Sequence, residues 1–376
     1  MKSLGLYIHI PWCIQKCPYC DFNSHALKSE APETQYIDAL LIDLQQDLQL
    51  LAEENTLISS IFIGGGTPSL FSAKSFHRLF AGIEKLIPFQ EDMEITLEAN
   101  SGTFESQKFK EFKSVGINRL SIGIQSFNNR HLKALGRIHS AEEALVAIDI
   151  AHQSGFEKLN LDLMFGLPEQ TNAEMVNDIQ TAIKAQPNHI SFYQLTLEPN
   201  TYFHKFPPKL PQDEQIYADQ LQCQQLLAEA GYQQYEISAY AKKSDQCQHN
   251  LNYWRFGDYL GIGAGAHGKL SISSPGNIIR TSKLKSPEQY LANNKAIIEQ
   301  VAIRELPLEY VMNQLRLKAG FDINDFQKAT GLSADRLQPA LIDCVSEGLL
   351  IKKGSHYCCS DSGWNFLDTV LEKFMH

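Results

Sequence analysis

The sequence predicts an α/β fold: an open, partial (β/α)6 barrel followed by a small C-terminal domain of winged-helix-like form. Six short apolar or β-branched runs alternate with longer segments of helical period over the first two-thirds of the chain. That order favours a parallel sheet with right-handed crossovers, and six strands are too few to close an eight-stranded barrel. From about residue 287 the pattern becomes helical and polar and ends in a hairpin-like run.

The predicted strands are bounded by Gly, Pro, Asn or Asp and comprise residues 6–10, 60–63, 94–99, 119–124, 159–164 and 189–195. Between them, residues 36–51 have apolar side chains at a spacing near 3.6 residues, which indicates an amphipathic helix. Further helices are predicted at residues 75–86, 106–115, 141–154, 173–185 and 214–230. Functional groups in such sheets collect at the carboxyl ends of the strands, so we expect the site there.

Two changes in the sequence pattern divide the chain. A proline-rich stretch at residues 206–211 interrupts the alternation, which predicts a barrel over residues 1–205 and a barrel-packing segment over 206–286. Residues 271–285 read as a hairpin or loop, and 287–376 as the small domain. The glycine-rich residues 261–268 lack the following helix and acid of a dinucleotide fingerprint. We interpret them as a turn near the mouth of the barrel, with His267 unassigned.

Composition narrows the class of protein. The 376 residues carry 33 Lys and Arg against 43 Asp and Glu, a formal charge of −10, and no basic run. Such a chain is poorly matched to a phosphate backbone, so we expect no nucleic-acid partner. No apolar stretch approaches the roughly 18 residues needed to span a bilayer. The first residues lack the apolar core and cleavage site of a secretory signal, so we expect a cytoplasmic protein.

Three of the eight cysteines, Cys13, Cys17 and Cys20, fall within eight residues in a C-x3-C-x2-C loop after the first strand. Clustered thiols in a cytosolic chain indicate metal binding more than disulfides. A zinc site needs a fourth ligand, for which His25 is a candidate. Iron–sulfur clusters normally take four thiolates, so three would leave one iron open to a substrate or cosubstrate. Three unrelated buried cysteines are the remaining alternative.

The strand at residues 60–63 ends in Gly64-Gly65-Gly66-Thr67-Pro68. Glycines at the carboxyl end of a strand let the backbone approach a ligand that side chains would block. A tight turn with no ligand explains the same three glycines equally well.

The cysteine loop, with the aromatic Tyr19 before its last cysteine, resembles the radical S-adenosylmethionine (SAM) superfamily. The resemblance implies a 4Fe–4S cluster held by Cys13, Cys17 and Cys20, whose fourth iron is chelated by the amino and carboxylate groups of SAM. The glycine run resembles the motif of that superfamily that contacts the SAM amino group. In this class the cofactor carries the hard chemistry and the protein positions it.

Polar side chains at the ends of later strands add to this resemblance, because a partial barrel brings them to one mouth. Together they are similar to the family of oxygen-independent coproporphyrinogen III oxidase, also called the dehydrogenase, and its relatives. That resemblance implies that SAM is surrounded by Tyr7, Tyr19, Gly65, Gly66, Thr67 and Glu98. It further implies that an adjacent pocket, where the dehydrogenase can hold a second SAM, is lined by Gln125, Arg137 and Asp162.

Two departures separate the chain from the dehydrogenase. The dehydrogenase continues its cysteine loop as C-x-C, whereas here Asp21 and Phe22 follow Cys20. It also has an N-terminal extension that closes over the porphyrinogen, whereas only six residues precede Tyr7. We therefore expect no turnover of coproporphyrinogen.

A third motif, His249-Asn250-Leu251-Asn252-Tyr253-Trp254, resembles the signature of the haem chaperones of this family. A histidine ring nitrogen can ligate haem iron, and Tyr253 and Trp254 offer flat apolar area with polar tips against a porphyrin. We therefore predict haem binding by His249, Tyr253 and Trp254. The alternatives are that His249 is a structural histidine beside a core tryptophan, or that Cys247 is a second or alternative ligand.

The leading hypothesis is a haem chaperone that delivers haem to haem-dependent proteins, for which the resemblance suggests membrane-bound respiratory enzymes. The 4Fe–4S cluster and SAM would then regulate transfer or a cluster-dependent homodimer rather than drive turnover. The alternative is a radical SAM enzyme that decarboxylates coproporphyrinogen or another substrate. A third hypothesis is a binding protein whose C-terminal domain engages a partner, and the acidic charge argues against DNA as that partner.

Overall fold

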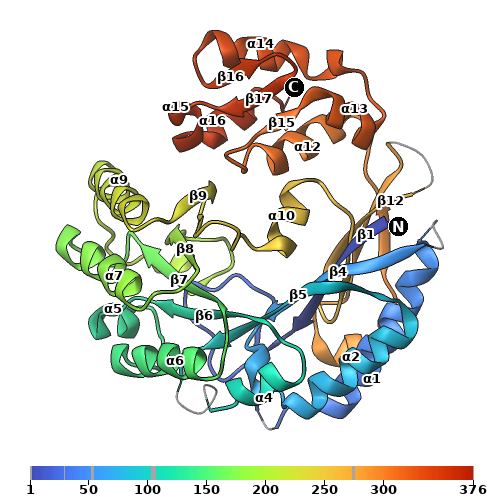
Figure 1. Cartoon of the computed structure of the whole chain (residues 1–376), viewed down its shortest axis with the longest axis vertical. Helices are drawn as coiled ribbons and strands as arrows, with labels where there is room; N and C mark the ends of the chain where they lie inside the picture. Colours follow the sequence, from blue (N-terminus) through green and yellow to red (C-terminus); the bar gives the residue numbers. More distant parts are fainter. Residues whose placement is uncertain (1, 29, 52–54, 103–106, 273–275, 376) are drawn as a thin grey trace.

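The computed structural model describes residues 2–28, 30–51, 55–102, 107–272 and 276–375 (Figure 1). Six parallel strands form the centre of its large sheet, in the order β1-β4-β5-β6-β7-β8. Each contains or closely overlaps one of the six predicted strands, which confirms the partial barrel. Their bounds are β1 Lys2–Ile10, β4 Thr56–Gly65, β5 Phe89–Asn100, β6 Arg119–Gln125, β7 Lys158–Phe165 and β8 His189–Gln194.

Helices cover the outer face of the curved sheet, as the alternating pattern predicts (Figure 1). Helices α6 and α7 begin with capping boxes at Ser140 and Thr171. In each, the cap side chain accepts the backbone N–H of a glutamate three residues later, and that glutamate accepts the N–H of the cap residue. Residue 106, where one helix was expected to start, lies outside the described residues, and that helix begins at Phe109. None of the described helices is long and apolar enough to cross a membrane. The outer helices are α1 Glu33–Asp47, α2 Ala73–Leu86, α4 Phe109–Ser114, α5 Asn129–Ala134, α6 Ala141–Gln153, α7 Asn172–Lys184 and α9 Asp213–Glu229.

The chain after residue 206 extends this sheet at both edges, to twelve strands in the described part of the chain. Strands β10 (Ala239–Ala241) and β9 (Gln233–Glu236) continue it antiparallel beyond β8. Strand β11 (Tyr259–Ile262) runs parallel to β1 on the other side. These strands are too short to show a period, so the sequence did not predict them.

Three antiparallel strands follow β11: β12 (His267–Ser271), β13 (Ile278–Ser282) and β14 (Ile297–Gln300). Strands β12 and β13 pair as a hairpin that begins at His267, four residues before the hairpin or loop predicted at residues 271–285. Residues 273–275 of that prediction lie outside the described residues. The glycine-rich residues 261–268 are partly strand, which corrects their interpretation as a simple turn. Gly261 lies so close to the backbone of His267 that a side chain there would collide with it.

Helix α10 (Gln248–Trp254) carries the HNxxYW motif and lies on the open side of the barrel, beneath the C-terminal domain (Figure 1). Its first free N–H, that of Gln248, donates to Glu94 Oε1 at 2.8 Å. Glu94 in turn contacts Arg119, and both side chains are buried. The helix is thus tied to the interior of the barrel through strands β5 and β6.

The C-terminal part consists of helices followed by a hairpin, as predicted. It comprises α12 (Leu306–Gln314), α13 (Ile323–Thr330), α14 (Gln338–Ser346), the hairpin β16 (Leu350–Lys353) and β17 (His356–Cys359), and β15 (Phe321–Asp322), which pairs with β17. Two short helices, α15 (Asp361–Asn365) and α16 (Leu367–Glu372), follow. A second apolar core fills it. Strand β14 still belongs to the large sheet, and we retain the division at residues 205 and 286 as a proposal.

Candidate functional site

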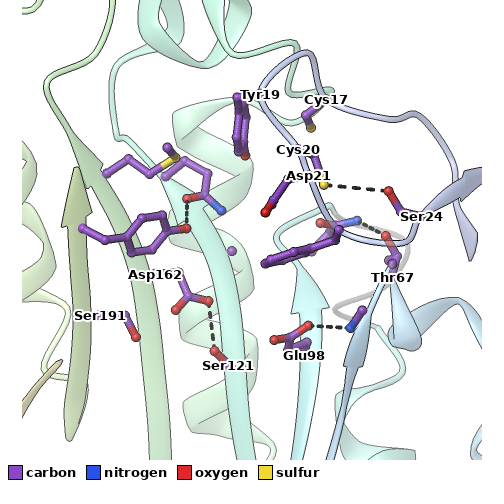
Figure 2. Close-up of a pocket in the computed structure, with 18 of the residues that line it drawn as sticks. Cys17, Tyr19, Cys20, Asp21, Ser24, Thr67, Glu98, Ser121, Asp162 and Ser191 are labelled. Carbon is purple, nitrogen blue, oxygen red and sulfur yellow. Dashed lines mark hydrogen bonds between the residues drawn. The ribbon is translucent and has the colours of Figure 1, made fainter. Parts of the chain in front are cut away.

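A cavity of about 680 Å³ opens at the carboxyl ends of the central strands (Figure 2). One end is formed by the cysteine loop and the glycine turn after β4, and strand-end side chains of β5, β6, β7 and β8 form its walls. Residues of α10, β9 and the C-terminal part form the rest. A partly enclosed cavity of this size suits a cofactor-sized ligand.

The cysteine loop is a closed excursion from the end of β1. Its two ends pair as short parallel strands, β2 (Trp12–Cys13) and β3 (His25–Ala26). Inside it, the N–H of Cys20 donates to the carbonyl of Cys17 at 3.1 Å, so a tight turn brings the two cysteines together. Cys13, Cys17 and Cys20 are free, half-buried and all line the cavity.

The electrostatics of the loop fit a 4Fe–4S cluster. Burial raises the pKa of the Cys13 and Cys20 thiols, so a positively charged group is needed to stabilise them as thiolates. One cation already stands beside the third thiol of the loop, because Arg137 Nη1 donates to Cys17 Sγ at 3.9 Å. Three thiols that face one cavity beside a cation are a suitable donor set for a cluster with one open iron.

The zinc alternative finds no support in the geometry. His25 Nε2 lies 3.2 Å from Asn23 Oδ1 and 3.3 Å from the carbonyl of Lys285, so the ring is engaged away from the thiols. Among the residues that the structure describes, no three or more His, Cys, Asp or Glu side chains are grouped to hold a single ion. Cluster thiolates bind separate irons and stand farther apart than the ligands of one zinc.

The glycine turn holds the cysteine loop as well as lining the cavity. The N–H of Gly66 donates to the carbonyl of Ile10, and that of Thr67 to the carbonyl of Trp12, each at 2.7 Å. A Cβ on Gly66 would lie 2.5 Å from the Trp12 carbonyl oxygen, and Gly65 has φ +109°. The close approach that requires glycine is therefore first an approach to the chain itself. Gly65, Gly66 and Thr67 nevertheless line the cavity.

Glu98 is a buried carboxyl group at the end of β5. Its Oε2 accepts the N–H of Gly65 at 3.1 Å, and no cation pairs with it among the described residues. Burial, reinforced by the nearby Asp162, raises the pKa of Glu98 from 4.5 to about 8. A carboxyl group in this state gains from a cationic ligand, so it fits the amino or sulfonium group of SAM.

Asp162 faces the same cavity from β7 (Figure 2). Its Oδ2 accepts a hydrogen bond from Ser121 at 2.9 Å and its Oδ1 accepts one from Asn160 at 2.8 Å. Burial raises the pKa of Asp162 as well. Unlike Glu98, this carboxyl group is already held by neighbouring side chains.

Gln125 and Arg137 both have features that a ligand would explain. Gln125 ends β6 in the left-handed region, at φ +70°, and accepts a hydrogen bond from Tyr193 at 2.8 Å. Arg137 donates from Nη2 to Asn100 and to the carbonyl of Gly123, while its buried Nε has no partner among the described residues. Backbone strain and an orphaned buried donor are typical of binding sites.

Tyr7 does not lie on the cavity wall. It sits three residues before the end of β1, and its hydroxyl shares a 2.9 Å hydrogen bond with His9 Nδ1. Its ring stacks on Phe62 at 6.3 Å. The side chain thus ends within the barrel, short of the cavity that Tyr19 lines from the cysteine loop.

The HNxxYW helix divides its residues between two faces. Asn250 and Trp254, four residues apart, line the cavity, whereas His249 and Tyr253 do not. His249 is fully buried; Nδ1 lies 2.9 Å from Ser60 Oγ and Nε2 lies 2.9 Å from the Tyr253 hydroxyl. Burial lowers the pKa of His249 to about 3, so its ring is neutral.

In this conformation both ring nitrogens of His249 are therefore engaged by protein groups. Cys247, the other ligand considered, is also buried and does not line the cavity. Burial raises the pKa of its thiol to about 12.

Two of the charged cavity residues that sequence reasoning missed are Glu236 and Arg316. They come from β9 and from the segment after α12, and Arg316 lies over the Trp254 ring. No local pattern could connect them, since 80 residues separate them in sequence. The one sequence signal near these two residues was the HNxxYW motif, whose Trp254 lies beneath Arg316.

Comparison with known proteins identifies the family and the fold. The family model of the radical SAM superfamily matches residues 7–182, and that of the HemN C-terminal domain matches residues 303–366. The solved structure of coproporphyrinogen III oxidase (HemN) from Escherichia coli superposes with a TM-score of 0.83, covering 99% of this chain and 90% of that one. At 22% identity, this likeness shows the fold alone.

Full-length relatives are more similar. Heme chaperone HemW of Haemophilus influenzae is 51% identical over 378 residues, which span 100% of this chain and 98% of the relative. Heme chaperone HemW of Escherichia coli is 46% identical over 376 residues, covering 100% and 99%. The thiol loop, the glycine turn and this identity over the whole length lead to one conclusion: the chain belongs to the HemW family of the radical SAM superfamily, whose cofactors are a 4Fe–4S cluster and SAM.

Proposed function

We propose that this chain is a haem chaperone, which binds haem and passes it to haem-dependent proteins. The observation that carries the proposal is the identity, over the whole chain, to relatives that are themselves named heme chaperones. The cavity adds a physical reason, because it has room beyond the cysteine end, where α10 presents Trp254. A protein that holds its own cofactors and also binds haem needs one part of the cavity for each, and we call the part beside Trp254 the haem compartment.

At the cysteine end, Cys13, Cys17 and Cys20 would hold the 4Fe–4S cluster, and Glu98 would face the cationic groups of SAM. When bound, the cluster supplies an electron-transfer centre and SAM a reactive sulfonium group. Around them the cavity presents Tyr19, Gly65, Gly66, Thr67, Gln125, Arg137 and Asp162. Tyr7 would act indirectly, by fixing His9 beneath the glycine turn.

At the other end, haem would bind against α10, with Trp254 as the surface that it meets first. Iron binds one ring nitrogen, so ligation by His249 requires the ring to leave Ser60 or Tyr253 and reach the cavity, for which α10 must turn or shift when haem enters. The neutral ring is the form that ligates iron. Tyr253 would then be free to contact the porphyrin. We therefore infer two states of the chaperone. In the closed state Ser60 and Tyr253 engage the His249 ring, and in the open state His249 ligates iron.

We further propose that the chaperone works in the cytoplasm, that its acceptors include membrane-bound respiratory proteins, and that cluster binding promotes a homodimer. Support for contact with another protein comes from the rim of the cavity. Ile14 and Phe22 of the cysteine loop are 49% and 57% exposed, and Ile138 nearby is 55% exposed. An apolar rim beside a cofactor loop suits an interface that forms when the cofactor orders the loop.

The experiment that tests the proposal is an anaerobic haemin titration of the reconstituted protein, followed in the Soret band. We expect saturable, stoichiometric binding by the natural sequence and a changed axial-ligand spectrum, with weaker binding, in His249→Gln. Ser60→Ala is the matched control, because it removes one hydrogen bond of the same ring and leaves the ligand in place. It should bind haemin at least as tightly as the natural sequence.

Absence of stoichiometric haemin binding would overturn the chaperone proposal. Binding with an identical spectrum in His249→Gln would instead restrict His249 to a structural role and leave the chaperone function standing. Fast cleavage of SAM coupled to conversion of a porphyrinogen would favour the radical enzyme.

A further inference from the structure

The two ends of the cavity differ in the charges they offer. At the cysteine end, Arg137 already donates to Asn100, to the backbone and to Cys17. The far end is lined by Glu236, Ser238, Ala239, Asn250, Trp254 and Arg316. Among these described residues Arg316 is the single cation, and it stands beside the aromatic side chain of the HNxxYW helix.

Arg316 is held in a defined position. Its guanidinium carbon lies 4.5 Å from the centre of the Trp254 ring, and its Nε donates to Glu236 Oε1 at 2.9 Å. Its Nη2 contacts the same oxygen. Glu236 is buried, whereas the Arg316 side chain remains 31% exposed toward the cavity. The Nε and Nη2 groups of Arg316 are therefore occupied by the Glu236 carboxylate, while part of the guanidinium still faces open space.

The backbone fixes this arrangement from both sides. Residues Glu236 and Leu317 form an antiparallel bridge. The N–H of Ile237 donates to the carbonyl of Arg316 at 3.2 Å, and that of Lys318 to the carbonyl of Tyr235 at 3.0 Å. Because β9 and the segment after α12 are joined here, the backbones of Glu236 and Arg316 are held side by side, and only their side chains can rearrange.

A planar guanidinium that lies on an indole ring and binds a carboxylate side-on is a recognition element for flat molecules with carboxylate arms. The indole provides apolar area for the flat part, and the guanidinium provides charge and direction for the arm. A tetrapyrrole with propionate side chains has this shape and chemistry. In its absence, Glu236 occupies the place that such a carboxylate would take.

We propose that Arg316 is the specificity-determining residue of the haem compartment: it binds a propionate of the tetrapyrrole in exchange for Glu236, with Trp254 as the apolar support. This inference rests on the proposed function, since it assigns a part of the same cavity to haem. It adds a carboxylate-binding residue outside the HNxxYW motif, and that residue comes from the C-terminal part of the chain.

A purely structural role is the competing explanation, in which the pair of Arg316 and Glu236 only joins the C-terminal part to the barrel. The two explanations predict opposite effects for Glu236→Gln. A structural pair weakens when its carboxylate is removed, and haemin binding weakens with it or stays the same. A propionate site gains instead, because the competing carboxylate has gone and the guanidinium is free.

The test is a titration with two probes, haemin and haemin dimethyl ester, whose propionates are blocked. For Arg316→Gln we expect haemin affinity to fall about tenfold or more, since a charge-assisted hydrogen bond is lost, while ester affinity stays within twofold. For Glu236→Gln we expect haemin affinity to rise severalfold and ester affinity to stay the same. Arg255→Gln is the matched control, because this exposed arginine follows α10 but lines a different cleft.

An equal loss of affinity for haemin and for the ester in Arg316→Gln would overturn the inference, as would weaker haemin binding in Glu236→Gln. Thermal unfolding of each variant shows whether it is folded, and Arg316→Lys should recover part of the haemin affinity because it restores the charge. Failure of the natural sequence to bind haemin at all would remove the proposed function itself. Binding that is normal in the natural sequence and in Arg316→Gln alike would remove only the role of Arg316.

Discussion

The cysteine loop and helix α10 each carry a sequence motif with candidate metal ligands, and the structure presents those ligands in opposite ways. The loop places its three thiols on the cavity wall, half-buried and free. Helix α10 turns His249 into the barrel, where Ser60 and Tyr253 engage both ring nitrogens. One motif is thus ready to bind, whereas the other is closed.

The difference follows from the local backbone. In a short loop whose two ends are paired, closely spaced side chains stay near one another, and here all three cysteines line one cavity. On a helix, residues four apart share a face, so His249 pairs with Tyr253 and Asn250 pairs with Trp254. A helical motif can therefore divide its residues between a structural face and a binding face. Spacing alone does not say which face is which.

The largest expected effect tests the cysteine loop, whose three thiols are free to bind. Replacing Cys17 by Ala removes one of three thiols that surround the cavity, and two thiolates do not hold a cluster with an open iron. We expect Cys17→Ala to lose the cluster, measured as iron content and as the broad visible absorption after anaerobic reconstitution. Cys358→Ala is the control, because Cys358 is also a half-buried free thiol but lies in β17. Equal iron content in both variants would refute the cluster assignment.

The next effect tests whether the cysteine end holds a carboxyl group that no cation of the described residues pairs with, whereas His249 of α10 has both ring nitrogens engaged. The pKa of Glu98 is raised from 4.5 to about 8 in the folded chain, so the folded state holds a proton that the unfolded state releases. The free energy of unfolding of the cofactor-free protein should therefore fall as the pH rises from 4.5 to 8. The loss amounts to a few kcal/mol, at about 1.4 kcal/mol for each pH unit.

Urea unfolding at pH 5 and pH 8 measures this effect. Glu98→Gln should flatten the pH dependence and make the cofactor-free protein more stable at pH 8, while its affinity for SAM in calorimetry drops. Asp162→Asn is a useful comparison, because that carboxylate is already held by Ser121 and Asn160. An unchanged pH dependence in Glu98→Gln would show that the pKa of Glu98 is not raised in the folded chain.

A smaller effect concerns how the cysteine loop is held. A side chain at Gly66 would collide with the Trp12 carbonyl, which lies one residue before Cys13. We expect Gly66→Val to weaken SAM binding and to lower the free energy of unfolding by about 1–3 kcal/mol, as overpacked sites do. Gly155→Ala separates backbone strain from collision, since φ there is +82° but a Cβ meets nothing within 4 Å; it should lose some stability and keep normal SAM affinity and iron content. Normal SAM affinity in calorimetry and normal iron content in Gly66→Val would contradict the role of this turn.

The sequence was sufficient for what depends on local pattern. The six central strands follow from short apolar or β-branched runs, the longer outer helices follow from periodicity, and the cysteine loop follows from spacing. The short helix α5 was not predicted. It was not sufficient for contacts made by distant segments: the short strand β11 beside β1, or the meeting of Glu236 with Arg316, has no local signature. It also could not orient α10, because the buried face of that helix is selected by Ser60 and Phe62 of β4.

The smallest effect tests whether the buried face of α10 is closed by its hydrogen bonds. Tyr253→Phe removes the hydroxyl that pairs with His249 Nε2 and leaves that buried nitrogen unsatisfied. We expect a loss of about 1–2 kcal/mol in the free energy of unfolding, whereas Tyr202→Phe, at a ring that is 61% exposed, should change little. Because the closed state loses part of its advantage, haemin affinity should rise a fewfold if His249 ligates iron. A variant that lost stability and haemin affinity together would indicate that this face only supports the barrel, and that haem binds through the Trp254 face alone.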